Sequence, residues 1–209
     1  MRNKLLRSFK FLLLVLALLP LDLRAGETPG TNGNPVLGDT RNRGVHLDEI
    51  AVGSGYAWGY LRQSHATFEA FPIFMRFGID MNSLVGIKDR NGTLQLAFEP
   101  FANPVIKPDS GAEAGLDVFI RYLYPVSSSV KLVSEIGTGP MYLSVKTAEQ
   151  GKGGFNFLNQ FGVGARLALS GDNALTIGYR FRHLSDAGMS QPNSGINSNA
   201  LVISYSILY

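Results

Sequence analysis

A histidine and a serine near the C-terminus have the types and the spacing of a nucleophile–base pair. His183 and Ser185 lie two residues apart in an alternating stretch, so both side chains are predicted to project from one face of a strand. Their Cβ atoms are then roughly 6–7 Å apart, within reach of a contact between the imidazole and the hydroxyl. If the next hairpin pairs Ser185 with Asn197, then Asn197 lies diagonal to His183 and can orient its ring. A serine activated by a histidine that a third group steadies is the general arrangement for acyl transfer.

By itself, a His-x-Ser sequence is more often part of an interfacial strand end or a loop than of a catalytic site. Three features favour a catalytic site at His183 and Ser185. The polar pair interrupts an otherwise apolar face that includes Ile177, Tyr179 and Phe181. It lies at the predicted outer rim of its strand, and a long connection, 186–196, follows it.

Eight alternating runs, each bounded by turn residues, cover the chain up to its C-terminus. They span about 48–62, 68–80, 93–103, 113–124, 129–145, 155–169, 173–185 and 197–209. One face of the runs is bulky and apolar, and the other mixes glycine with charges of both signs. A soluble sandwich would bury the apolar face, whereas a membrane barrel turns it to lipid and encloses the charged one. The pattern, the even strand number and the 22 aromatic residues (13 Phe, 8 Tyr, 1 Trp) predict an all-β, eight-stranded antiparallel transmembrane β-barrel.

The lumen of so small a barrel is filled by side chains. Eight charged residues have luminal parity and are expected to pair as a polar plug: Arg76, Glu99, Asp117, Arg121, Lys131, Glu135, Arg166 and Arg180. Ion pairing in the lumen is therefore the expected role of Glu99 and Glu135, in preference to acid–base catalysis.

The N-terminus is predicted to be an export signal. Residues 1–25 combine four early basic residues with a short apolar run and a small-residue cleavage site, which is typical of a signal peptide. Without them, 14 basic residues (19 − 5) stand against 15 acidic ones (16 − 1), so nothing favours nucleic-acid binding. The chain has no cysteine, which excludes disulfides and thiolate chemistry. We expect a flexible N-terminal segment over 26–44 and a barrel domain over 45–209.

The segment from His183 to Asn197 resembles the signature of the lipid A 3-O-deacylase (PagL) family. About 15 residues carry the resemblance: His183-Leu184-Ser185-Asp186-Ala187-Gly188 and Gln191-Pro192-Asn193-Ser194-Gly195-Ile196-Asn197, followed by the terminal strand. Members of that family are eight-stranded outer-membrane esterases whose site lies on the barrel exterior. The resemblance implies that His183 is a general base and Ser185 a nucleophile. It implies, as substrate, the ester-linked 3-hydroxyacyl chain at position 3 of lipid A.

Two positions depart from the family's pattern. The best-studied form of the family has a glutamate fourteen residues after the histidine, where this chain has Asn197, and the family has an asparagine after the serine, where this chain has Asp186. An amide can fix a histidine's orientation, but it stabilises an imidazolium less than a carboxylate does. An ionised Asp186 beside a developing oxyanion would oppose catalysis, unless it is protonated, turned away or itself orients His183. The backbone N–H of Gly188 is a further candidate oxyanion donor.

The remaining expectations concern partners and alternatives. His46 and His65 lie near opposite ends of the first run without metal-ligand spacing, so both are expected to be solvated. Neither a metal nor a cofactor is expected. The expected partners are lipid A or lipopolysaccharide of the outer leaflet and the outer membrane itself, with a homodimer left open. The alternative function is a non-catalytic small barrel with a structural or lipopolysaccharide-binding role, and a soluble exported sandwich ranks third.

Overall fold

A computed structural model describes residues 44–88, 91–151 and 153–209. The predicted signal peptide (1–25) and the predicted flexible segment, apart from Gly44, lie outside the described residues. Within the described ranges, no helix has the length and apolar composition needed to cross a membrane.

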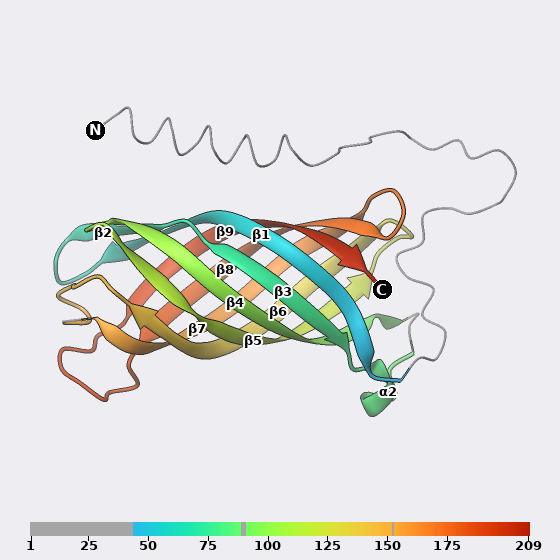
Figure 1. Cartoon of the computed structure of the whole chain (residues 1–209), viewed down its shortest axis with the longest axis horizontal. Coiled ribbons are helices and arrows are strands. Elements are labelled where there is room, and N and C mark those ends of the chain that lie inside the picture. Colours follow the sequence, from blue (N-terminus) through green and yellow to red (C-terminus); the bar gives the residue numbers. More distant parts are fainter. Residues whose placement is uncertain (1–43, 89–90, 152) are drawn as a thin grey trace, which may run out of the picture. The chain divides into compact units, whose positions relative to one another are not determined.

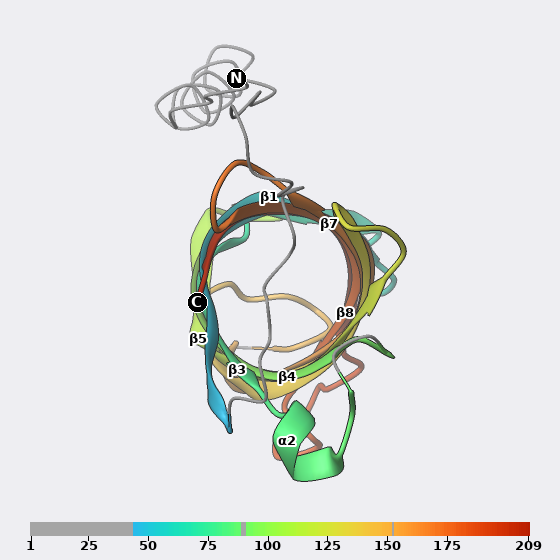
Figure 2. The same cartoon turned by 90° about the vertical axis from the view of Figure 1, so that its right-hand side faces the viewer.

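The described residues form a closed antiparallel β-barrel (Figures 1 and 2). Its elements are β1 (His46–Leu61), β2 (Ala66–Ala70), β3 (Ile73–Asp80), the short helix α2 (Asn82–Val85), β4 (Thr93–Lys107), β5 (Gly111–Pro125), β6 (Val130–Leu143), β7 (Gly154–Ala168), β8 (Asn173–Ser185) and β9 (Ile196–Leu208). From β3 to β9 each strand pairs with the next one in sequence, β1 pairs with both β2 and β3, and β1 also pairs with β9 from Glu49↔Leu208 to Trp58↔Asn199. The pairing closes the sheet, which confirms the predicted fold class.

The second strand of the barrel wall is divided into β2 and β3 at Phe71 and Pro72, a break that the alternation did not predict. Proline has no N–H to donate to a neighbouring strand. The barrel wall stays bonded there, because Phe71 N donates to Pro104 O at 2.9 Å and Pro72 O accepts from Gly55 N at 3.1 Å. Both β2 and β3 pair with β1 and with β4, so together they act as one of eight strands.

The end of the lumen nearer the two termini of the barrel is filled by ion pairs. Six charged side chains form a closed ring: Glu49, Arg121, Glu135, Arg180, Glu99 and Arg76. Most of the predicted luminal charges lie in this ring, and Asp117 accepts a hydrogen bond from Gln160. Glu49 had not been singled out from the sequence, yet it accepts from Arg121, Arg166 and Ser206 at 2.5–2.6 Å.

The other end of the lumen is mainly apolar, with one buried ion pair between Arg182 and Glu113. Leu61, Phe68, Leu143, Leu158, Leu184 and Ile196 are among its fully enclosed members. Val145, from the connection after β6, packs into the same cluster. The strand ends at this side of the barrel are therefore anchored from within by apolar packing.

The connections at the two ends of the barrel differ. The C-terminus and α2 lie at one end, whereas the connection between β8 and β9, residues 186–195, lies at the opposite end (Figure 1). If the C-terminal end is periplasmic, residues 186–195 are extracellular, in agreement with the outer rim predicted for His183 and Ser185.

Candidate active site

Strand β8 presents His183 and Ser185 on the outside of the barrel. Arg182 and Leu184 are buried within it, whereas Phe181 is 42% exposed and the two polar residues are half-buried. The strand is paired with β7 up to Ser185 and with β9 up to Leu184, so its alternation is held in register up to the rim. Leu184, between the two candidate residues, packs in the apolar half of the lumen and pairs with Ile196 of β9.

Asn197 is the direct cross-strand partner of His183, and not of Ser185 as expected. Ser185 lies beyond the last β8–β9 pair, and it pairs instead with Phe157 of β7. The hairpin expectation was wrong because a ten-residue connection, unlike a two-residue turn, does not fix strand register. The actual register brings His183 Nδ1 to 2.6 Å from Asn197 Oδ1. An amide oxygen can only accept, so Nδ1–H donates and Nε2 carries the lone pair that a general base needs.

The hydroxyl of Ser185 and the imidazole lie on one face without being joined. Within the described residues, His183 has its hydrogen bond to Asn197 and none to Ser185. Side chains at this spacing on one strand face have Cβ atoms roughly 6–7 Å apart, so a contact between Nε2 and Oγ requires side-chain rotation but no backbone change. Catalytic hydrogen bonds commonly tighten only when substrate is bound.

The connection 186–195 packs against the imidazole through Gly195, which sequence analysis did not single out. Gly195 has φ +73°, and a Cβ at this position would lie 2.6 Å from His183 Cε1 and 3.3 Å from Nε2. Only glycine fits this combination of backbone conformation and close approach. The Ser194-Gly195 sequence before the last strand indicates a turn. Its approach to His183 could not be predicted, because it depends on the register of β8 and β9.

Comparisons with known proteins decide the family of this barrel. The sequence pattern of the lipid A 3-O-deacylase (PagL) family matches residues 89–206, more than half of the chain and all of the region from β4 almost to the end of β9. The chain belongs to the PagL family. This family membership agrees with the resemblance seen in residues 183–197.

Solved structures support the same architecture. The crystal structure of the outer membrane enzyme PagL is 18% identical, with a TM-score of 0.53, and the match covers 76% of this chain and 98% of that one. The crystal structure of Neisserial surface protein A (NspA) is 13% identical, with a TM-score of 0.57, and the match covers 80% and 100%. At these identities the similarities establish a common small-barrel fold. No curated protein sequence matches the chain. PagL-family membership and the barrel neighbours support an outer-membrane location.

Asp186, where the PagL family has asparagine, directs its carboxylate into its own connection. Its Oδ1 accepts from Gly188 N at 2.9 Å, and its Oδ2 accepts from Ser190 N at 2.9 Å and from the Ser190 hydroxyl. The hydrogen bond from the Ser190 side chain, together with those backbone N–H groups, lowers the pKa of Asp186 below its ordinary value. The carboxylate is therefore turned away from the candidate site, and it neither contacts nor orients His183 in this structure. The N–H of Gly188 is engaged by Asp186, so a role as oxyanion donor requires another loop conformation.

Two connections far apart in sequence hold the 186–195 segment of this PagL-family barrel in place. Buried Glu149 accepts from Gln63 N at 2.8 Å, and its carbonyl accepts from Ser194 N at 3.0 Å. Gln150 donates to Asn193 Oδ1 at 2.8 Å, and that oxygen also accepts from Asp186 N at 3.3 Å. Sequence analysis missed this network because the hydrogen bonds that join different connections link residues 43 to 86 positions apart that have no shared motif.

An outward groove lies one strand beyond the candidate site. It has a volume of about 490 Å³ and is lined by Tyr56, Trp58, Gly59, Thr67 and Glu69. Trp58 pairs with Asn199 of β9, two residues from Asn197. The groove is therefore on the same outer wall as His183 and Ser185, which bears on how a lipid substrate would lie.

Proposed function

We propose that this protein is an outer-membrane serine esterase that hydrolyses the ester-linked 3-hydroxyacyl chain at position 3 of lipid A. Membership of the PagL family supports the substrate class. The observation that carries the proposal is the 2.6 Å bond from His183 Nδ1 to Asn197, two residues from a serine on the same outward face. That arrangement supports a base and an orienting group for a nucleophilic serine.

In the proposed reaction, His183 Nε2 carries protons during both formation and hydrolysis of an acyl-serine. Nε2 takes the proton of Ser185 Oγ as that oxygen attacks the ester carbonyl, and a tetrahedral intermediate forms. Nε2 then returns the proton to the sugar alkoxide, which leaves as an alcohol, while the acyl chain stays on Ser185. A water activated at Nε2 hydrolyses the acyl-serine, releasing the fatty acid and restoring the hydroxyl.

Asn197 is proposed to fix the tautomer and the plane of His183. Its amide oxygen holds the Nδ1 proton, so the productive nitrogen stays available without a carboxylate. Because the amide is neutral, it gives the transient imidazolium less stabilisation than the glutamate of the family's pattern would.

The substrate is proposed to arrive laterally within the outer leaflet. The exterior around the site is apolar, with Tyr179, Phe181 and Phe161 exposed to the surroundings. Acyl chains of lipid A would lie along this surface, and the groove at Tyr56 and Trp58 offers room for part of the lipid. Export is proposed to use residues 1–25 as a signal peptide, which is removed from the mature chain.

Mass spectrometry of lipid A tests the proposal. Gram-negative cells expressing the wild-type chain should lose one 3-hydroxyacyl group from lipid A, and cells expressing Ser185→Ala should not. The purified variant should be at least about 10³-fold slower, because removing a serine nucleophile eliminates the covalent route. Heat-modifiable migration of both proteins in gels provides the folding control.

The same experiment separates the esterase from the alternative. Activity retained in folded Ser185→Ala would exclude this nucleophile. Unchanged lipid A with folded wild type, both in cells and with purified lipid A in detergent, would favour a non-catalytic small barrel that binds lipopolysaccharide or serves a structural role.

A further inference from the structure

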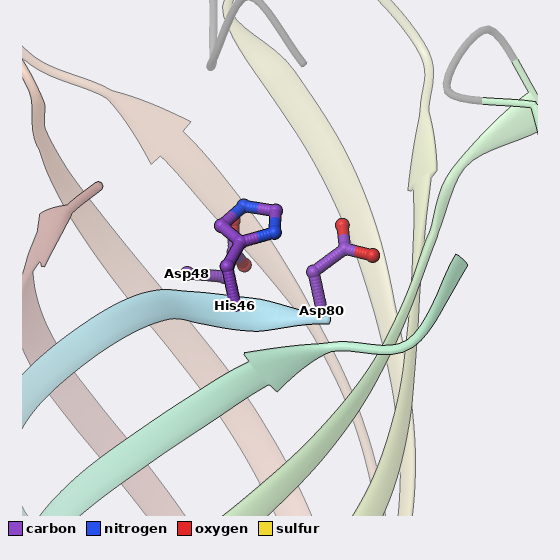
Figure 3. Close-up of side chains that lie close together, drawn as sticks. All are labelled: His46, Asp48 and Asp80. Carbon is purple, nitrogen blue, oxygen red and sulfur yellow. The ribbon is translucent and has the colours of Figure 1, made fainter. Parts of the chain in front are cut away.

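A second group of potentially reactive side chains lies at the end of the barrel opposite to the candidate active site. His46 and Asp48 lie at the start of β1, and Asp80 ends β3. One ligand atom from each of the three lies within 4.8 Å of the others. In Figure 3 the imidazole of His46 faces the carboxylate of Asp80, with Asp48 behind the ring. We propose that these three residues bind a divalent transition-metal ion, with Zn²⁺ as the reference ion.

A β-bulge gathers the three side chains on one face. His46 pairs with Asp80, but the β1–β3 register shifts between Leu47 and Glu49 and leaves Asp48 as the extra residue. Strict alternation from the buried Glu49 would turn His46 and Asp48 outward. With the bulge, Leu47 is 40% exposed, whereas Asp48 reaches the luminal Gln95. Bulges that redirect side chains in this way are common beside functional sites.

The imidazole of His46 has the tautomer that metal coordination requires. Its Nδ1 lies 2.8 Å from the carbonyl oxygen of Gly44, and a carbonyl only accepts, so Nδ1 carries the hydrogen. Nε2 therefore presents its lone pair, and within the described residues this buried atom has no hydrogen-bond partner. A histidine that coordinates through one nitrogen and donates the other N–H to a backbone carbonyl is the usual arrangement at metal sites. This finding corrects the expectation of a solvated His46.

Both carboxylates are also oriented by neighbouring donors. Asp48 Oδ2 accepts from Gln95 Nε2 at 2.8 Å, and Asp80 Oδ1 accepts from Asn82 N at 2.7 Å. Hydrogen bonds of this kind fix the direction of metal-binding carboxylates and are part of a working site. Gln95 in turn bonds Arg121, so the cluster is continuous with the luminal ion-pair ring.

The donor set selects the class of ion. One imidazole nitrogen with two carboxylate oxygens suits Zn²⁺, Mn²⁺, Fe²⁺ or Co²⁺, whereas Ca²⁺ and Mg²⁺ take oxygen ligands almost exclusively. Bond lengths of 2.0–2.2 Å in a tetrahedral site place ligand atoms roughly 3.4 Å apart, so the cluster needs to contract by about an ångström. Water would complete the coordination. An ion here would fasten the first strand of the barrel to the end of β3.

Calorimetric titration of the untagged protein, purified from outer membranes in detergent and stripped with a chelator, tests the proposal. Zn²⁺ should bind saturably at one ion per chain and raise the melting temperature. His46→Gln and Asp80→Asn should each weaken binding at least tenfold and abolish the rise in melting temperature. The matched control is His65→Gln, because His65 lies at the other end of β1 and contacts Tyr60. This variant should bind Zn²⁺ like the wild type.

Co²⁺ gives an independent spectroscopic test. A Co²⁺ ion held by imidazole and carboxylates in a low-coordinate site should produce visible absorption that is present in His65→Gln and absent in His46→Gln. Absence of saturable Zn²⁺ binding to the folded wild type would overturn the proposal, as would equal affinity in wild type and His46→Gln. Neither measurement depends on lipid A, so the result is separate from that of the proposed esterase.

Discussion

The lumen and the outer face of β8 use polar side chains in opposite ways. In the lumen, Glu49, Glu99 and Glu135 each pair with at least two arginines, and all of these side chains are at most 8% exposed. On the outer face, His183 is half-buried and, among the described residues, has one side-chain hydrogen bond, to Asn197. A dense network with many mutual partners holds one geometry, whereas a sparse pair can rotate toward a substrate.

This difference separates stability from chemistry. Removing one member of a buried charge network leaves its partners without compensation, which is strongly destabilising. Changing a side chain at a lightly bonded outer site has little effect on folding, usually within about 0.5 kcal/mol. The fold should therefore tolerate loss of the candidate nucleophile, but not loss of a luminal glutamate.

The largest effect on stability is expected for Glu49→Ala. The change leaves Arg166 without its ion pair and removes one of two carboxylates from Arg121. We expect a loss of about 3–5 kcal/mol in the free energy of unfolding, measured by urea titration in detergent or lipid vesicles. Esterase activity of the fraction that stays folded should be nearly unchanged.

An exposed ion pair provides the matched control for this prediction. Lys107 and Glu69 are 2.6 Å apart on the outside of the barrel, with the lysine side chain 48% exposed. Lys107→Ala should cost at most about 1 kcal/mol. Equal losses in the two variants would show that the luminal ring is no more important for stability than a surface pair.

The contrast also explains what the sequence could predict. Parity alone places Arg121 and Glu135 inside and His183 and Ser185 outside, because a strand alternates with a period of two. Parity does not tell which residues face each other across a hairpin with a long connection. The pairing of His183 with Asn197, the contact of Gly195 with the imidazole and the bulge at Asp48 therefore required the structure.

The next effect, on activity, is expected for Gly195→Ala. The new methyl group would lie 2.6 Å from His183 Cε1, so the imidazole must move away from its bond to Asn197. Misplacement by about an ångström commonly reduces rate about 10²-fold, and we expect a loss of roughly this size in kcat/KM. Gly154→Ala is the control, since Gly154 also has positive φ (+96°) at the same end of the barrel but has open space at its Cβ. If both variants lose activity equally, the effect comes from backbone strain and Gly195 does not position His183.

A gain is expected for Asn197→Glu. A carboxylate would accept the Nδ1 proton as the amide oxygen does, and its charge would stabilise the imidazolium that forms in the transition state. The tautomer is already correct in the wild type, so we expect only a roughly tenfold rise in kcat. A fall in kcat would mean that Asn197 does not act through His183.

The smallest effect on activity is expected for Asp186→Asn. The carboxylate bonds Gly188 and Ser190 within its own connection, so the change should alter kcat/KM at neutral pH by no more than about threefold.

The lowered pKa of Asp186 means that the charged form stabilises the folded connection at pH values above the ordinary aspartate pKa of about 3.9. This contribution is lost as the pH falls through the lowered value. Hydrogen exchange at the Gly188 and Ser190 amides should therefore show protection that declines on acidification in the wild type and is independent of pH in Asp186→Asn, after correction for intrinsic exchange rates. A severe loss of activity in this variant would instead indicate that the carboxylate turns toward His183 during the reaction, which would make the outer site as dependent on charge as the lumen.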